Sequence, residues 1–576
     1  MIINRKIAMS FGIICSMKSI SKFAGVRYFA ATTTNHGTSW SQKWFKNVQL
    51  KSPVFYCDAN DIEVMKDPHE FYNSLKELSS NAKERITLAS LYLGNGKLEK
   101  DLVDIIYKTM DNASQPIKCN VLLEYTRGSR GSNNSRTMLL PIVNKFTKDT
   151  NVALFHTPNL RGLLRKIVPE RFNETINVSH LKVYLFDDTL IISGANLSND
   201  YFTNRQDRYI MFKNNKQLCD YFDDLVQTIS QFSFQLTPHD TVKMKDNFPF
   251  HPYKSRKKDF NKAAERLLKD FILKYSTRRE IFDGNCVERL TCTAGTELPK
   301  DQHSTLKKNN KDTLIFPLLQ MKTMGIDQDE EVTSNIISFA PPPSQLVLAT
   351  AYFNLTDRYW DAVCENDSEN RLIMAHPKAM GFYKAPGMAG GIPNAYSLIA
   401  LRRYRQLQNN RQTDKTKFYE FHHPGWTFHG KGLWGILSDV KNAPIVTLIG
   451  SPNFGKRSVY RDMEAQVAIV TVNKQLKEDL IEERDSFFEN TTLVSRQTFN
   501  DKERAPSWWV WDKDAPIQLS LTQAPKQLPI QNNATLHISA GVQIKNYTVP
   551  RNIRVEVDVS KKILFWVKIP CFGWYV

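Results

Sequence analysis

The 576 residues of this chain are enough for two sizeable α/β domains with extensions. A net charge of +18 indicates an anionic partner, which could be nucleic acid, an anionic membrane or a phosphorylated small molecule. Eight scattered cysteines argue against a disulfide framework or a zinc site. No apolar run reaches the ~20 residues of a membrane span, so we expect any membrane contact to be peripheral.

The N-terminal segment has the composition of a mitochondrial transit peptide. Residues 1–57 hold no Asp or Glu, and their basic residues are interleaved with Ser, Thr and apolar side chains. The alternative is a secretory signal built on the apolar run 7–17, but no convincing small-x-small cleavage site follows closely. We therefore expect a targeting segment over 1–40 and a mitochondrial protein.

A first α/β domain is expected over residues 41–240. The stretch 67–78 opens with Asp-Pro and places apolar residues at helical spacing, and it leads into an apolar, strand-like run. The pattern continues to alternate, which is typical of an α/β fold. The predicted elements are helices over 67–78 and 98–110 and strands over 86–92, 118–123, 182–186 and 190–193.

Residues 241–315 are charged and polar and are expected to form a basic insertion or linker. Its first part, KSRKKDFNKAAERLLKDFILKYSTRRE, fits either a basic amphipathic helix resting on a membrane or a solvated helix packed between domains. Both interpretations stay open at this point.

A second α/β domain is expected over 316–495, with strands at 346–352, 371–375 and 445–449. The extension 496–576 has no assigned role. Its segments 507–512 and 563–576 combine aromatic residues with nearby lysines, which suits an interfacial anchor. Burial against the second domain is the alternative.

A His-x-Lys pair occurs twice, as VSHLKVYLFDD (His180, Lys182) and TFHGKGLW (His429, Lys431). On a strand, residues i and i+2 point to one face, so both members of a pair can address one phosphate. The intervening Leu181, like Val183 and Leu185, should then face a core. Two such pairs in one chain predict one composite phosphate-handling site.

The agreement between the halves extends beyond these pairs. Asn196 in SGAN is followed eleven residues later by Asp207, and Asn453 in GSPN eleven residues later by Glu464. Each half therefore repeats His, Lys, Asn and an acid in the same order, which indicates an internal duplication. The first copy also carries Asp187, where the second has Ile436.

With these motifs the chain resembles the phospholipase D superfamily, whose members carry two HKD motifs on two similar domains. Within it, five stretches of the sequence resemble the mitochondrial phosphatidyltransferases: ASLYLGNGKLEKDLVD, EYTRGSRGSNNSRTMLLP, LFHTPNLRGLLRKIVPERFNETI, HLKVYLFDDTLIISGANLSNDYFTNRQDRY and PGWTFHGKGLW. The resemblance covers roughly residues 55–490. It implies an α/β/α sandwich in each half, an active site at their interface, and neither a catalytic metal nor a cofactor.

The resemblance further implies transfer of a phosphatidyl group from CDP-diacylglycerol to sn-glycerol 3-phosphate, with release of CMP, on the route to phosphatidylglycerol and cardiolipin. Such an enzyme would be a peripheral protein of the inner mitochondrial membrane. A nuclease on the same fold is an alternative, but aromatic residues are not interleaved with the basic ones as nucleic acid binding requires. Another acceptor alcohol is a further alternative.

Metal-free chemistry at phosphorus needs a nucleophile, a proton donor and fixed positive charge. We expect His180 to be the nucleophile, because its motif is complete, and His429 to be the acid and base. Asp207 and Glu464 should orient the two histidines. The remaining candidates are Lys182, Lys431, Asn196 and Asn453 for the phosphoryl oxygens, and Asp187, whose place on a turn favours a structural role.

Two arginine clusters could bind substrate phosphates. One lies in TRGSRGSNNSR and the other in LRGLLRK. Which cluster meets which phosphate is open, and solvated surface arginines are the alternative. The candidates are Arg127, Arg130 and Arg136 in the first cluster and Arg161 and Arg165 in the second.

Overall fold

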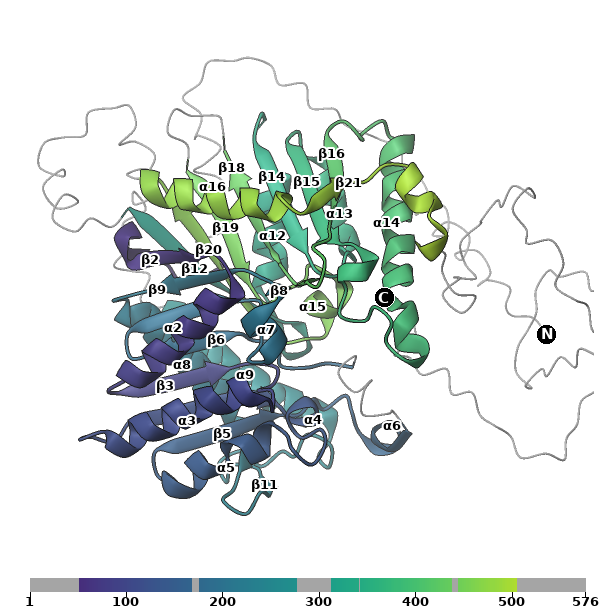
Figure 1. Cartoon of the computed structure of the whole chain (residues 1–576). Helices are drawn as coiled ribbons and strands as arrows, with labels where there is room; N and C mark the ends of the chain where they lie inside the picture. Colours follow the sequence, from purple (N-terminus) through teal and green to yellow (C-terminus); the bar gives the residue numbers. More distant parts are fainter. Residues whose placement is uncertain (1–50, 168–175, 277–311, 341, 438–443, 505–576) are drawn as a thin grey trace, which may run out of the picture.

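The computed structural model describes residues 51–167, 176–276, 312–340, 342–437 and 444–504 (Figure 1). The expected targeting segment 1–40, residues 277–311 of the linker and residues 505–576 of the extension lie outside this part of the chain. The transit peptide and the aromatic anchor thus stay predictions.

The first half is built on a nine-stranded sheet with the order β11-β10-β5-β4-β3-β6-β7-β9-β2. Its central strands β3, β4 and β5 are parallel, and the others pair antiparallel. The strand bounds are β2 Ile62–Met65, β3 Arg85–Ala89, β4 Lys118–Glu124, β5 Thr150–Phe155, β6 Val183–Phe186, β7 Thr189–Ser193, β9 Tyr209–Phe212, β10 Phe234–Leu236 and β11 Val242–Lys243.

The second half repeats this arrangement in the order β12-β20-β19-β18-β14-β15-β16-β21, again with three adjacent parallel strands, which are β14, β15 and β16. The predicted duplication is therefore visible strand by strand. The bounds are β12 Thr313–Met321, β13 Ile326–Asp327, β14 Gln345–Thr350, β15 Glu369–Ala375, β16 Thr416–Phe421, β18 Gly432–Ile436, β19 Ile445–Gly450, β20 Glu464–Thr471 and β21 Thr491–Leu493.

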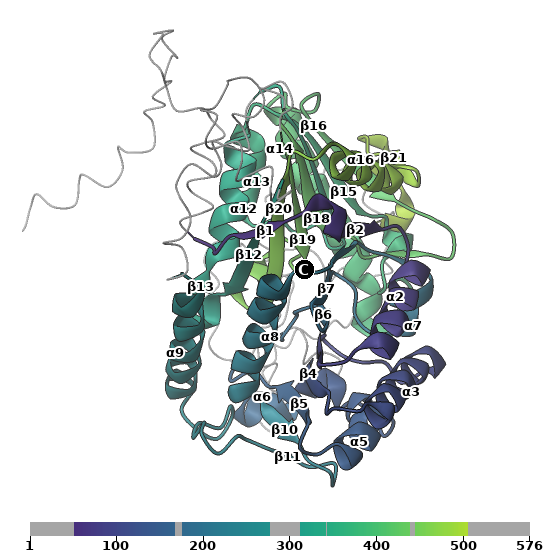
Figure 2. The ribbon, with the colours of Figure 1, turned by 90° about the vertical axis from the view of Figure 1, so that its left-hand side faces the viewer.

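Helices cover both faces of each sheet. Figure 2 shows α2, α3 and α5 on one side of the first sheet and α8 and α9 on the other, and α12 and α13 opposite α16 around the second. The bounds are α2 Pro68–Asn81, α3 Lys97–Asn112, α4 Tyr125–Gly128, α5 Ser135–Lys145, α6 Gly162–Ile167, α7 Asn199–Thr203, α8 Lys216–Gln231, α9 Lys257–Ser276, α12 Gln328–Ser338, α13 Asp357–Glu365, α14 Ile392–Asn409, α15 Lys456–Tyr460 and α16 Lys474–Phe488. The α/β/α fold expected for each half is confirmed.

Local sequence accounts for these elements. The Asp67 carboxylate accepts hydrogen bonds from the backbone N–H groups of His69 and Glu70, and Pro68 occupies the first turn, so α2 begins where the sequence predicts. Its apolar face, including Phe71 and Leu75, is buried against the first sheet.

One strand departs from the expected domain boundaries. The segment β1, Phe55–Cys57, pairs antiparallel with β12 at the edge of the second sheet, although it precedes the whole first half in the chain. The segment β1 therefore departs from the expected first domain over 41–240: the described chain begins in the second sheet and then crosses to the first. The apolar alternation of three residues is too short to reveal such a partner.

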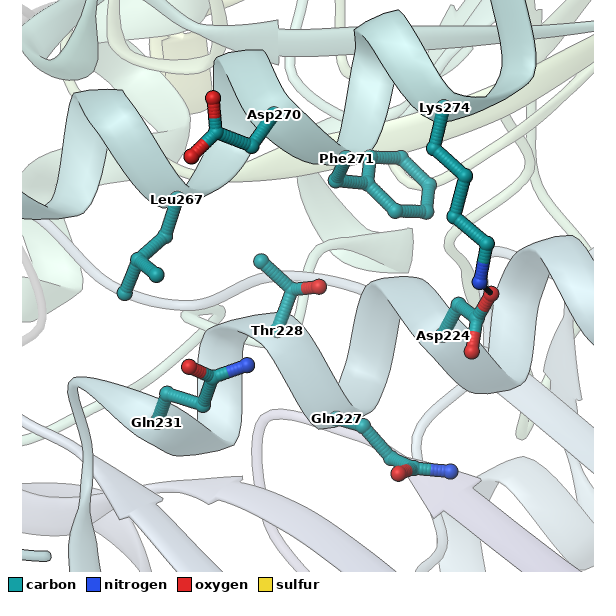
Figure 3. A pocket seen from close by; sticks show the side chains of 8 residues that line it. All are labelled: Asp224, Gln227, Thr228, Gln231, Leu267, Asp270, Phe271 and Lys274. Carbon is teal, nitrogen blue, oxygen red and sulfur yellow. Dashed lines mark hydrogen bonds and ion pairs between the residues drawn. The ribbon is translucent and has the colours of Figure 1, made fainter. Parts of the chain in front are cut away.

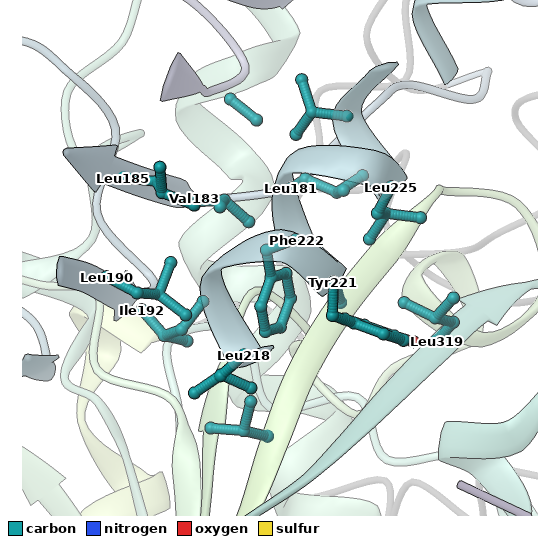
Figure 4. Close-up of a cluster of buried hydrophobic side chains, with 14 of the residues drawn as sticks. Leu181, Val183, Leu185, Leu190, Ile192, Leu218, Tyr221, Phe222, Leu225 and Leu319 are labelled. Carbon is teal, nitrogen blue, oxygen red and sulfur yellow. The ribbon is translucent and has the colours of Figure 1, made fainter. Parts of the chain in front are cut away.

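The two halves share one hydrophobic core. Leu181, Val183 and Leu185 face it, as predicted, together with α8 residues such as Phe222 and with Leu319 of β12 in the other half (Figure 4). Because this core belongs to both halves, the seam between them is buried like a domain interior.

The linker helix α9 also packs into this shared core. Phe260, Leu268 and Phe271 on its apolar face are buried there. Of the two interpretations, packing between the domains is the one observed, and that face is not available to a membrane. Between α8 and α9 lies a surface cavity of about 320 Å³, where Lys274 and Asp224 approach to 2.5 Å (Figure 3).

A buried ion pair also joins the halves. The guanidinium of Arg208, directly before β9, is fully buried and bonds to the Glu483 carboxylate of α16 at 2.7–2.8 Å. It also donates to the Leu448 carbonyl and lies 3.8 Å from the Trp434 ring. Such a pair strongly penalises the loss of one partner, since the other charge stays buried alone.

We predict that Arg208→Met lowers the free energy of unfolding by about 3–5 kcal/mol. The double change Arg208→Met with Glu483→Met should recover part of this loss, because neither charge is then left buried alone. Denaturant unfolding of the three proteins measures both effects. A loss below about 1 kcal/mol in the single variant, which is the range of an exposed ion pair, would contradict the stabilising role of this buried pair.

Candidate functional site

The two His-x-Lys pairs occupy equivalent places at the seam. His180 and Lys182 come directly before β6, and His429 and Lys431 directly before β18. The histidines are 8% and 6% exposed, and each lysine only 1%. All four side chains therefore act in surroundings from which most water is removed.

Short backbone bridges across the seam set the position of each histidine. The strands β8, Arg205–Gln206, and β17, Thr427–Phe428, pair in parallel, and the His429 N–H donates to the Gln206 carbonyl at 2.8 Å. In the same way, the His180 N–H donates to the Met463 carbonyl at 2.8 Å. Each histidine is thus held beside the residue that precedes an acid of the other half.

The orienting acids are consequently exchanged between the halves. His180 Nδ1 lies 2.8 Å from Glu464 Oε2, and His429 Nδ1 lies 2.6 Å from Asp207 Oδ2. A carboxylate at Nδ1 accepts a hydrogen bond from the ring N–H. The lone pair of the imidazole is then on Nε2, which points away from the carboxylate. Neither half contains a complete His–acid pair by itself.

The lysines lie against their own histidines. Lys182 Nζ donates to the His180 carbonyl at 2.7 Å, and Lys431 Nζ donates to the His429 carbonyl at 2.6 Å. Lys431 Nζ also lies 3.4 Å from Asp207 Oδ2. Two buried lysine amines are therefore fixed next to the two imidazoles.

Burial and these neighbours govern the protonation of the site. Burial, followed by the nearby lysine, holds the pKa of both histidines well below its usual range. Burial likewise raises the pKa of Asp207 and Glu464 and lowers the pKa of Lys182 and Lys431. Both imidazoles are accordingly neutral at neutral pH in the free protein.

The two half-sites differ at Nε2. The Tyr201 hydroxyl lies 3.2 Å from His429 Nε2 and receives a hydrogen bond from Asn196 Nδ2 at 3.1 Å. We assign the ring proton of His429 to Nδ1, which faces the Asp207 carboxylate, so that the hydroxyl donates to Nε2. No hydrogen-bond partner of His180 Nε2 occurs among the described residues.

Tyr201 was not among the predicted site residues, although the repeat contains a signal for it. Tyr201 follows Asn196 by five residues, and Ser458 follows Asn453 by five. Ser458 does not reach a histidine; its Oγ accepts a bond from the Asn453 N–H. Aligning the repeats would therefore have marked this position as the place where the halves differ.

The two asparagines are also unequal. The Asn196 side chain is engaged in its own half, where its Oδ1 accepts from the Leu91 N–H at 3.3 Å. The Asn453 Oδ1 is buried with no partner in the described part of the chain. Of the two asparagines, Asn453 is therefore the one that keeps unused hydrogen-bonding capacity among the described residues.

Asp187 does not join the site. It lies in the β6–β7 turn with a φ of 51°, and its carboxylate accepts from the backbone N–H groups of Lys83, Glu84 and Arg85 at 2.8–3.0 Å. Its inclusion among the catalytic candidates is thus corrected: the acid of the first motif ties the hairpin to the start of β3.

The arginine candidates fall into different environments. Arg127 stacks on the Tyr92 ring at 3.9 Å, beside the end of β3. Arg136 is paired with Asp240, with Nε at 2.9 Å from its carboxylate, so its guanidinium is engaged within the first half. Arg161 is half-buried and Arg165 is exposed, with Arg165 on α6.

No group of three or more potential metal ligands occurs among the residues that the structure describes. In the same part of the chain, every helix falls short of the length and apolar character that crossing a membrane requires.

Known proteins resemble this chain over most of its length. The mitochondrial CDP-diacylglycerol–glycerol-3-phosphate 3-phosphatidyltransferases of Gallus gallus and Homo sapiens are 42% and 41% identical over 475 residues, covering 81% of this chain and 84% of each relative. The Schizosaccharomyces pombe enzyme of that name is 32% identical, covering 74% of this chain and 88% of its own.

The fold has a solved counterpart. Phosphatidylserine synthase of Haemophilus influenzae matches with a TM-score of 0.57 and 20% identity, over 79% of this chain and 92% of that structure. A scan against models of protein families finds no match. The extent and identity of the sequence matches establish that this chain belongs to the family of CDP-diacylglycerol–glycerol-3-phosphate 3-phosphatidyltransferases.

Proposed function

We propose that this chain transfers a phosphatidyl group from CDP-diacylglycerol to sn-glycerol 3-phosphate and releases CMP, acting through a phosphatidyl-histidine. The names of its relatives support the overall reaction. The observation that carries the mechanism is the neutral His180, whose Nε2 has no hydrogen-bond partner in the described chain, beside a second imidazole and two buried lysines.

In the first step, His180 Nε2 attacks the phosphorus that bears the diacylglycerol. A P–N bond forms, the P–O bond to CMP breaks, and His429 supplies a proton to the departing oxygen. Glu464 holds the Nδ1 proton of His180 and stabilises the positive charge that develops on the ring.

In the second step, a hydroxyl oxygen of sn-glycerol 3-phosphate attacks the same phosphorus. His429 accepts the hydroxyl proton, the P–N bond breaks, and His180 returns to its neutral form. The proton that His429 gave to CMP is thereby replaced, so the two steps leave the protein unchanged.

His429 must be protonated for the first step, although its pKa is low in the free protein. An anionic pyrophosphate beside the ring favours the imidazolium and raises this pKa, so substrate binding itself prepares the acid. Lys182, Lys431 and Asn453 are the groups proposed to bind the phosphoryl oxygens. Asn196 acts through Tyr201 as a positioning residue.

The acceptor needs a phosphate site of its own, so that it competes with water for the intermediate. We assign this role and the binding of the CDP pyrophosphate to Arg127, Arg130, Arg161 and Arg165, without dividing the four between the two phosphates.

The mitochondrial names of the relatives and the acid-free N-terminus support a peripheral location on the inner mitochondrial membrane.

The purified full chain tests this function. Incubated with CDP-diacylglycerol micelles and a chelator, it should release CMP with sn-glycerol 3-phosphate and not with serine, phosphatidylglycerol or water. The His180→Gln protein, checked for an unchanged melting temperature, should release none. Release that depends on serine would indicate another acceptor, and cleavage of DNA in place of CMP release would favour the nuclease.

We predict that Tyr201→Phe raises the pKa of His429, because it removes a hydrogen bond that stabilises the neutral ring. The alkaline limb of the kcat profile, which reports the protonated acid of the first step, should therefore move to higher pH. Loss of one positioning bond should also lower kcat by roughly tenfold.

Tyr184→Phe is the matched control for this change. It removes another buried phenolic hydroxyl of the same half, which bonds to the Ala195 carbonyl and to neither histidine. This variant should keep the alkaline limb in place. An unshifted limb in Tyr201→Phe would contradict the assigned hydrogen bond.

A further inference from the structure

The short helix α6 exposes apolar side chains that have no structural use within the described chain. Leu163 and Ile167 are 67% and 46% exposed, and they are two of only seven large hydrophobic residues that the described chain leaves exposed. Leu163 is the most exposed of the seven. The two are four positions apart and so lie on one side of the helix.

The same helix is basic. Arg161, Arg165 and Lys166 fall within seven residues that contain no Asp or Glu. Arg165 and Lys166 are exposed, and Arg161 is half-buried. Apolar side chains ringed by positive charge are complementary to an anionic lipid surface, where the apolar part enters the acyl boundary and the cations meet phosphates.

Packing contacts hold this helix against the first half. Leu160, two residues before its start, is buried, and the Arg165 guanidinium stacks on the Tyr253 ring at 4.1 Å. Tyr253 in turn packs on the buried His156 with ring centroids 5.1 Å apart. Figure 1 shows α6 at the right-hand edge of the first half, beyond the ends of its strands.

The projection lies at the edge of the sheet that holds the candidate site. Strands β3, β4 and β5 are parallel, so their carboxyl ends meet at one edge. Ser90, after β3, bonds to Asn196 of the site, and α6 follows β5 at that same edge. A bilayer bound by α6 would therefore lie at the edge of the sheet that carries the candidate site.

We propose that α6 docks this protein on an anionic lipid bilayer, with Leu163 and Ile167 inserted among the acyl chains and Lys166 on lipid phosphates. The inference rests on the proposed function in one respect: its substrate, CDP-diacylglycerol, is a lipid of that bilayer. Docking at this edge would bring the reacting phosphate to the seam without removing the lipid from the membrane.

Co-sedimentation of the full chain with vesicles tests the proposal. Phosphatidylcholine vesicles containing phosphatidylglycerol are compared with pure phosphatidylcholine vesicles. Leu163→Ser with Ile167→Ser should weaken partitioning into the anionic vesicles by roughly tenfold or more, because two apolar side chains no longer insert. Lys166→Glu should weaken binding to the anionic vesicles and leave binding to the neutral ones unchanged.

Leu273→Ser with Leu493→Ser is the matched control. These leucines are 60% and 57% exposed but lie on α9 and β21. This protein should bind vesicles like the original. Equal losses in both double variants, or unchanged vesicle binding of Leu163→Ser with Ile167→Ser, would overturn the assignment; in the second case α6 would suit a protein partner instead.

Activity in two lipid forms separates this inference from the proposed function. With substrate in detergent micelles, the Leu163→Ser/Ile167→Ser protein should release CMP as fast as the original, and with substrate in vesicles it should be slower by about the loss in binding. Absence of CMP release from both proteins in micelles would instead refute the proposed reaction and leave the vesicle-binding result to stand by itself.

Discussion

Two backbone hydrogen bonds across the seam are the constraint on which this site depends. The N–H groups of His180 and His429 donate to the carbonyls of Met463 and Gln206, each in the residue before an acid of the opposite half. A bond at that position leaves little freedom in where the next side chain points. The carboxylates therefore reach the Nδ1 atoms, and the site exists only when the halves are packed together.

The shared core makes this packing possible and also tunes the chemistry. Burial on both sides of the seam is the largest cause of the lowered pKa of each histidine, and the buried lysines act in the same direction. The same packing that orients the imidazoles thus keeps them neutral, which a nucleophile requires. Tyr201 then makes the halves unequal. Its hydroxyl is hydrogen-bonded to Nε2 of His429, whereas Nε2 of His180 has no hydrogen-bond partner among the described residues.

Much of this arrangement was predictable from the sequence, because it is encoded in short-range patterns. The alternation around Leu181 placed β6 and its core face, and the equal spacing from Asn196 to Asp207 and from Asn453 to Glu464 marked the two acids. The exchange of those acids between halves depends on contacts more than 200 residues apart, for which a single sequence holds no signal. The same limit explains β1, and also Arg136, whose partner Asp240 lies in a distant turn.

The central claim is that the phosphatidyl group passes through His180 while His429 moves the proton. Mass spectrometry of the protein, quenched after mixing with CDP-diacylglycerol and no acceptor, tests it most directly. The account predicts a phosphatidyl adduct on the peptide that contains His180, which disappears when sn-glycerol 3-phosphate is added. An adduct on the peptide that contains His429, with His180 unmodified, would contradict it.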